Sequence, residues 1–174
     1  MTTSSGASSV LERGHLRIRE LIAGLPAEHL RTTGIGGGEW SPKDLVGHLA
    51  LWHEIAVRTI GEQRRGQRPW VVDVFGAPGP GPNDEELAKR AGWSPGHARA
   101  VYDRSFAQVL AAIEGLSDDE WSSPVDGWAM EPADLGGLLG VVLGKDELPF
   151  GHAFAHIPDL ETFVEMYGTH PTSP

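Results

Sequence analysis

Three histidines on two separate stretches of the chain have the type and spacing of a metal site: His48, His152 and His156. His152 and His156 are four residues apart, so one helical turn places them on the same side of a helix. All three fall on the apolar stripe of an expected helix, where an unpartnered imidazole is costly. If the two stretches face each other, three imidazoles meet at a point suited to a divalent metal.

The pair alone is a weak signal, because the histidine content of the chain gives about 0.4 such pairs by chance. The simpler interpretation is two helical histidines that hydrogen-bond to their neighbours, with one or both exposed. A metal becomes attractive because three buried imidazoles have six ring nitrogens to satisfy. Two other histidines compete for the site. His15 also lies on an apolar stripe, whereas His53 follows His48 by five residues, about 140° around a helix.

Other chemistries have less support. The chain has no Gly-x-Ser-x-Gly sequence, and the histidine pair lacks the glutamate of His-Glu-x-x-His. The glycine cluster in residues 31–39 lacks the Lys-Ser/Thr ending of a phosphate-binding loop, and no strand precedes it. We interpret it as a connector.

The helix expected over residues 41–63 has the strongest start signal in the chain. Ser41 is in position to cap it, Pro42 suits its first turn, and Asp44 can take the acidic place of a capping box. One face of this helix then carries Leu45, His48, Trp52, Ile55 and Thr59.

The last helix is expected over residues 147–167, with Leu148 on the same face as the histidine pair. Pro158 should kink this helix or end one segment at Ile157. Residues 135–144, with glycines at positions 136, 140 and 144, suit either a helix with a smooth glycine face or a β-segment.

Two further long helices are expected over residues 9–25 and 94–116, with short ones over 84–91 and 117–121. Residues 1–8 resemble a disordered tail. Four long helical patterns without alternating strands predict an all-α fold: one four-helix-bundle domain over residues 9–170, with long loops.

The long loop of residues 64–83 contains apolar residues that should cover one end of the bundle. We expect Trp70 and Phe75 from this loop to line a substrate pocket with Trp52, the loop acting as a lid. Tyr102 or a carboxylate is a candidate proton donor.

The bulk composition narrows the class of partner. The chain has 174 residues, a net charge of −10 and no cysteine. The negative net charge argues against binding to nucleic acids or to anionic membrane surfaces. The missing cysteine excludes disulfides and thiolate ligands within the chain. With no secretory signal and no apolar stretch long enough to span a bilayer, a cytoplasmic protein is expected.

The segment Gly38-Glu-Trp40-Ser41-Pro-Lys-Asp-Leu-Val-Gly-His48-Leu-Ala, with the late His152-x3-His156 pair, resembles the DinB-like (DinB/DfsB, YfiT-like) superfamily. Asn83 and the segment from Ile113 to Trp121 also fit, so the resemblance covers most of residues 9–167. It implies a bacterial-type four-helix bundle, often a homodimer, with a divalent metal on His48, His152 and His156. Members of that superfamily include bacillithiol- and mycothiol-dependent transferases, a maleylpyruvate isomerase and a colibactin self-protection protein.

The sequence therefore predicts a metal-dependent enzyme that acts on a small electrophile by hydrolysis or thiol transfer. Zn²⁺, Ni²⁺ or Fe²⁺ would lower the pKa of a bound water or of a low-molecular-weight thiol co-substrate. One alternative is a binding or self-resistance protein that sequesters a reactive or hydrophobic compound without turnover. A third interpretation is a structural or dimerisation protein with an idle site.

Overall fold

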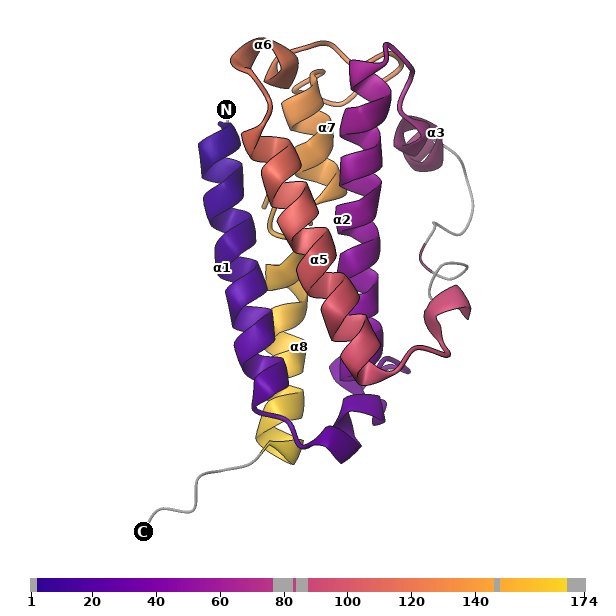
Figure 1. Cartoon of the computed structure of the whole chain (residues 1–174), viewed down its shortest axis with the longest axis vertical. Helices are drawn as coiled ribbons and strands as arrows, with labels where there is room; N and C mark the ends of the chain where they lie inside the picture. The colour runs from indigo at the N-terminus through magenta and orange to yellow at the C-terminus, as the bar shows by residue number, and fades with distance from the viewer. Residues whose placement is uncertain (1–2, 77–82, 84–87, 146–147, 169–174) are drawn as a thin grey trace.

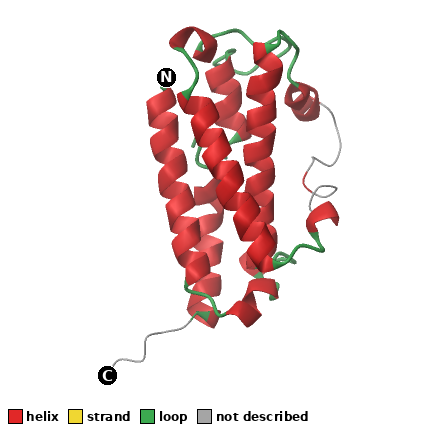
Figure 2. Ribbon diagram, viewed as in Figure 1, coloured by secondary structure: helices red, strands yellow, loops and turns green. Residues whose placement is uncertain are grey.

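The computed structural model describes residues 3–76, 83, 88–145 and 148–168, and the regular structure of these residues is helical (Figure 2). Strand-like pairing in the described residues is limited to two isolated β-bridges. The predicted all-α fold is confirmed. The helices with defined bounds are α1 (Ser4–Ala23), η1 (Ala27–Arg31), η2 (Ile35–Gly37), α2 (Pro42–Arg64), α3 (Trp70–Gly76), α5 (Pro95–Glu114), α6 (Asp118–Trp121), α7 (Leu135–Val142) and α8 (His152–Tyr167). Residues 88–90 are also helical.

The long helices form a bundle in which α2 packs most extensively against α5, and α1 packs against α8 and α5 (Figure 1). The fourth position of the bundle is shared by two helices, with α7 in one half and α8 in the other. Residues 143–151 connect them. The last histidine pair is therefore carried by a helix that begins in the middle of the bundle.

Helix α2 begins as the sequence predicts. The Ser41 hydroxyl accepts a hydrogen bond from the Asp44 backbone N–H, and the Asp44 carboxylate accepts one from the Ser41 N–H. This capping box satisfies backbone donors that would otherwise lack partners in the first turn. The helix ends at Arg64, one residue beyond the expected end.

Helix α8 begins at His152, so the prediction of a helix from residue 147 is wrong at its start. Phe150 has a positive φ of 63°, which is incompatible with a right-handed helix. The His152 N–H instead donates to the Leu143 carbonyl, and Leu148 is 46% exposed rather than part of the buried face. Pro158 lies inside α8 without ending it at Ile157.

Helix α1 begins at Ser4, so a disordered tail over residues 1–8 is wrong for the residues from Ser4 onward. The Thr3 hydroxyl caps the helix by accepting from the Gly6 N–H. Ala7 is fully buried in the core, which extends the packed part of α1 beyond the stripe visible in the sequence. Residues 1–2 lie outside the described residues. Of the two interpretations of residues 135–144, the helical one is confirmed by α7, which Asp134 caps.

The apolar core divides into two clusters, one built around Trp52, Val109 and Leu138 and the other around Leu45, Tyr102 and Leu160. On α1 and α5, the residues of the two clusters are separated in sequence by His15 and by Ser105. His48 and His53 flank the residues of α2 at which one cluster gives way to the other, and His152 and His156 precede the buried cluster residues of α8. We call these side chains the polar layer. It consists of His15 on α1, His48 and His53 on α2, Ser105 on α5, and His152 and His156 on α8.

Candidate metal centre

The three histidines singled out in the sequence converge within the polar layer. The Nε2 atom of His152 lies 3.0 Å from Nε2 of His48 and 3.3 Å from Nε2 of His156. One ligand nitrogen from each ring falls within 4.8 Å of the other two. The structure therefore brings together nitrogen donors from α2 and from the first two turns of α8.

This arrangement fits a divalent metal. Zinc–imidazole bonds of about 2.0–2.1 Å in a tetrahedral site place ligand nitrogens roughly 3.3 Å apart. This value is close to the 3.0 and 3.3 Å that separate the His152 Nε2 from those of His48 and His156. Without a cation, two Nε2 atoms that face each other need a proton between them, because otherwise their lone pairs repel. Three protein ligands also leave a fourth position for a water or a substrate, as in catalytic zinc sites.

Burial holds these imidazoles in the neutral form that ligates metals. Burial is the largest cause of the lowered pKa of His48, to about 2, and the nearby His152 and His156 lower it further. Burial likewise lowers the pKa of His152 to about 3 and that of His156 to about 4. All three rings are uncharged at neutral pH, so binding a metal requires no proton to leave them.

Aromatic side chains surround the three rings. The Trp52 ring lies 5.8 Å from that of His152, and the Phe75 ring stacks on Trp52 at 6.1 Å. Of the three expected pocket residues, Trp52 thus lies beside His152 and Phe75 contacts Trp52. Trp70 is placed differently: its ring packs against the Arg58 guanidinium, 4.6 Å from the ring centre, and its backbone N–H donates to the Glu62 carboxylate. The structure does not bring Trp70 to the three histidines.

Two neighbours of the site were part of the sequence motif but were not predicted to line the pocket. The Trp40 ring lies 4.6 Å from that of His48 and 6.0 Å from that of His156. The Asn83 Oδ1 accepts a hydrogen bond at 3.0 Å from the Trp52 indole N–H. An interaction with the Asn83 side chain also raises the His48 pKa, against the larger effect of burial. The useful signal for Trp40 was its position directly before the cap of α2.

The competing histidines and Tyr102 lie elsewhere in the polar layer or beside it. The Tyr102 ring is 4.6 Å from that of His15 and 5.6 Å from that of His53, and burial raises the Tyr102 pKa. In the described residues, neither His15 nor His53 belongs to the three-histidine group. A role for Tyr102 as proton donor stays a prediction.

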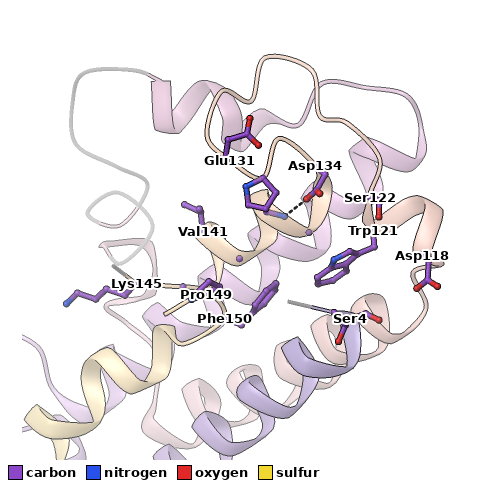
Figure 3. Close-up of a pocket in the computed structure, with 16 residues that line it drawn as sticks. Ser4, Asp118, Trp121, Ser122, Glu131, Asp134, Val141, Lys145, Pro149 and Phe150 are labelled. Atoms are coloured by element: carbon purple, nitrogen blue, oxygen red, sulfur yellow. Dashed lines mark hydrogen bonds between the residues drawn. The ribbon is translucent and has the colours of Figure 1, made fainter. Parts of the chain in front are cut away.

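A larger cavity of about 540 Å³ lies between the start of α1, α6 and α7 (Figure 3). Trp121 and Phe150 line it, and their rings stack with centres 5.8 Å apart. The charged ends of Asp118 and Lys145 lie on opposite sides. None of the three histidines lines this cavity. The donor geometry, rather than cavity size, therefore identifies the candidate site.

The glycine face of α7 is explained by contacts around this cavity. A Cβ atom at position 136 would collide with the Trp121 indole, and one at position 140 would lie 3.2 Å from the Pro149 Cβ and 3.4 Å from the Phe150 ring. The glycines therefore allow aromatic rings and the connecting segment to approach the helix closely.

Comparisons with solved structures place this fold among known proteins. An uncharacterised protein from Escherichia coli UTI89 matches with a TM-score of 0.69 and 14% identity, over 95% of each chain. A mycothiol-dependent maleylpyruvate isomerase matches with a TM-score of 0.61 and 14% identity, over 97% of this chain and 64% of the isomerase. The present chain thus spans about two thirds of the isomerase. The sequence matches none of the curated proteins.

Two findings complete the comparison. Every helix in the described residues falls short of the length or the apolarity that crossing a bilayer requires. The family model of the DinB superfamily matches residues 11–148, which include His48 and the whole of α2, α5 and α7. With that match over most of its length, the chain belongs to the DinB superfamily.

Proposed function

We propose that this protein is a divalent-metal-dependent enzyme that acts on a small electrophile, by hydrolysis or by thiol transfer. The observation that carries the proposal is the convergence of the Nε2 atoms of His48, His152 and His156 at separations that suit a shared metal. A bound metal would supply a Lewis acid and lower the pKa of a water or thiol in its open position.

The side chains around the site have distinct roles in this proposal. The three imidazoles hold the metal in their neutral form. Trp40, Trp52 and Phe75 exclude water from the side on which their rings lie, which strengthens electrostatic interactions within the site. The Asn83 amide, tied to Trp52 by its hydrogen bond, is placed to orient a polar group of a substrate.

A thiol would have to come from outside the chain, because the sequence contains no cysteine. Thiol transfer is supported by the structural similarity to a protein named as a mycothiol-dependent isomerase. Hydrolysis needs no second substrate and uses the same open metal position. The proposal therefore leaves two reaction types for one site, and they differ in whether a thiol is consumed.

The test begins with metal analysis of the purified protein before and after incubation with Zn²⁺, Ni²⁺ or Fe²⁺. We expect close to one equivalent in the wild type and a strong loss in His48→Ala, while His97→Ala, which alters an exposed histidine on α5, keeps the metal. Hydrolysis is then measured with p-nitrophenyl acetate, and thiol transfer with monochlorobimane in the presence and absence of mycothiol.

Less than about a tenth of an equivalent of metal, unchanged by added ions, would overturn the proposal. It would then favour the alternative of a protein that binds a reactive or hydrophobic compound without turnover. Turnover that is equal in wild type and His48→Ala would also contradict a role for the three histidines.

A further inference from the structure

A small cavity is lined by the proposed metal ligand His152 but not by His48 or His156. Its volume is about 10 Å³, measured as the space open to the centre of a water molecule, and a single buried water needs roughly that much. The walls are apolar except for Tyr102 and three imidazoles of the polar layer: His15, His53 and His152.

The His53 ring, which lines this cavity, carries an acceptor. The Ser105 hydroxyl donates its only hydrogen to the Tyr102 carbonyl at 3.0 Å. Because that hydrogen is used, Ser105 must accept from the His53 Nδ1, which lies 3.2 Å away. A neutral imidazole carries one proton, and burial lowers the His53 pKa to about 3, so the ring is neutral. Its Nε2 is left without a proton.

The His15 ring presents a second acceptor. Its Nε2 lies 3.4 Å from the Asp103 carboxylate, and a carboxylate attracts an N–H rather than a lone pair. Burial lowers the His15 pKa to about 4 against the opposing effect of Asp103, so this ring is also neutral. With the proton on Nε2, Nδ1 of His15 is an acceptor, and it is buried without a hydrogen-bond partner in the described residues.

The His152 ring presents a donor. When its Nε2 lone pair binds a metal, the proton of the neutral ring is on Nδ1. That Nδ1 is buried and has no hydrogen-bond partner in the described part of the chain. Metal-binding histidines almost always donate their second N–H to a carboxylate, a carbonyl or a water.

One donor and two acceptors around a space for one molecule match the hydrogen-bonding capacity of water. We propose that a buried water in this cavity accepts from the His152 Nδ1–H and donates to His53 and His15, which makes these two histidines positioning residues for the metal ligand. The inference rests on the proposed function, since the metal fixes the proton on the Nδ1 of His152. The water then links α8 to α1 and α2, and through Ser105 to α5.

The first test uses the unaltered, zinc-loaded protein. Long-range ¹H–¹⁵N correlation of the histidine rings is expected to show the proton on Nδ1 in His152 and His53, and on Nε2 in His15. A crystal structure at atomic resolution is expected to show one water within hydrogen-bonding distance of all three rings. A cavity without a water, or a His53 ring protonated on Nε2, would overturn the inference.

The second test measures zinc affinity by competition with a chromophoric chelator. His53→Leu removes the acceptor and should weaken zinc binding by about 10–100-fold, the usual effect of losing such a partner. His53→Gln keeps a carbonyl acceptor and should recover part of that loss. His97→Leu, on the exposed surface, is the matched control and should bind zinc as the wild type does.

These outcomes separate the two proposals. Failure of the wild type to bind zinc overturns the proposed function and this inference together. Normal zinc binding in the wild type and in both His53 variants overturns the buried water alone. Equal losses in His53→Leu and His53→Gln would also contradict it, because a purely packing role does not depend on an acceptor.

Discussion

At the scale of single residues, the chain buries more imidazoles than one metal centre uses. His15, His48 and His53 are all less than 10% exposed. A buried neutral histidine costs no stability as long as the unfolded chain is also neutral, but it lowers stability once the unfolded chain takes up a proton. Each one therefore makes the protein sensitive to acid, and the size of this effect depends on how far burial lowers the pKa.

His15 gives a direct test of this sensitivity. Its pKa is about 4 in the folded protein, compared with 6.5 for an unperturbed histidine, and burial is the main cause of the difference. Above pH 6.5 both states are neutral; below it the unfolded state gains a proton first, so stability falls until about pH 4. In metal-free protein, His15→Phe, which keeps a ring against Phe106, should reduce this loss by roughly 2–3 kcal/mol.

The measurement is the free energy of unfolding in urea at pH 7.0 and pH 4.5. The exposed variant His97→Phe serves as control and should show the same pH dependence as the wild type. A His15→Phe protein whose stability falls as steeply as that of the wild type would contradict a neutral His15 in the folded state.

At the scale of elements, local signals predicted the structure well where neighbouring residues decide it. Ser41, Pro42 and Asp44 are close in sequence, so the start of α2 could be read directly. The start of α8 could not, because the positive φ of Phe150 and the exposure of Leu148 depend on how the described residues between α7 and α8 pack. The spacing of apolar residues alone predicted that Leu148 belongs to the helix.

The capping box predicts a measurable contribution from one hydroxyl. Ser41→Ala removes the acceptor for the Asp44 N–H and should lower the free energy of unfolding by about 1 kcal/mol. Ser9→Ala, at an exposed position inside α1, should change it little. Urea unfolding of both variants checks this, and equal stability of the two would contradict a stabilising cap.

Two glycines in helices should respond to alanine with opposite signs. At Gly137, a Cβ atom would collide with the Pro132 backbone carbonyl, so Gly137→Ala should destabilise the protein by about 1–3 kcal/mol. At Gly96, near the start of α5, no heavy atom lies within 4 Å of the added carbon, so Gly96→Ala should be neutral or stabilising by up to about 1 kcal/mol. Thermal unfolding distinguishes them, and stabilisation by both would refute the close approach at Gly137.

At the scale of the whole molecule, the three converging histidines join helices that are distant in sequence. The sequence predicted which histidines meet, because His152 and His156 share a helix face and His48 follows a well-defined helix start. It did not predict the contacts of His53 with Ser105 or of His15 with Phe106. Those contacts depend on how helices α1, α2 and α5 pack side by side, which no local spacing encodes.

Metal binding should therefore stabilise the whole bundle. At a free Zn²⁺ concentration about 100 times the dissociation constant, binding adds about 2.7 kcal/mol, which is roughly 5–10 °C in melting temperature for a domain of this size. Differential scanning fluorimetry with and without Zn²⁺ measures the shift. His48→Ala should lose it, and an undiminished shift in that variant would place the metal elsewhere.

The polar layer should also favour one alignment of the helices along the bundle axis. If one long helix slid by a turn, its imidazole or hydroxyl group would face leucines of a neighbouring helix, and leucines would face the remaining imidazoles. Each such mismatch buries a polar group among apolar side chains without a hydrogen-bond partner, which costs on the order of 1–3 kcal/mol. The side chains that suit a metal therefore also specify the register of the helices, because they favour one axial alignment among several that a purely apolar interior would tolerate.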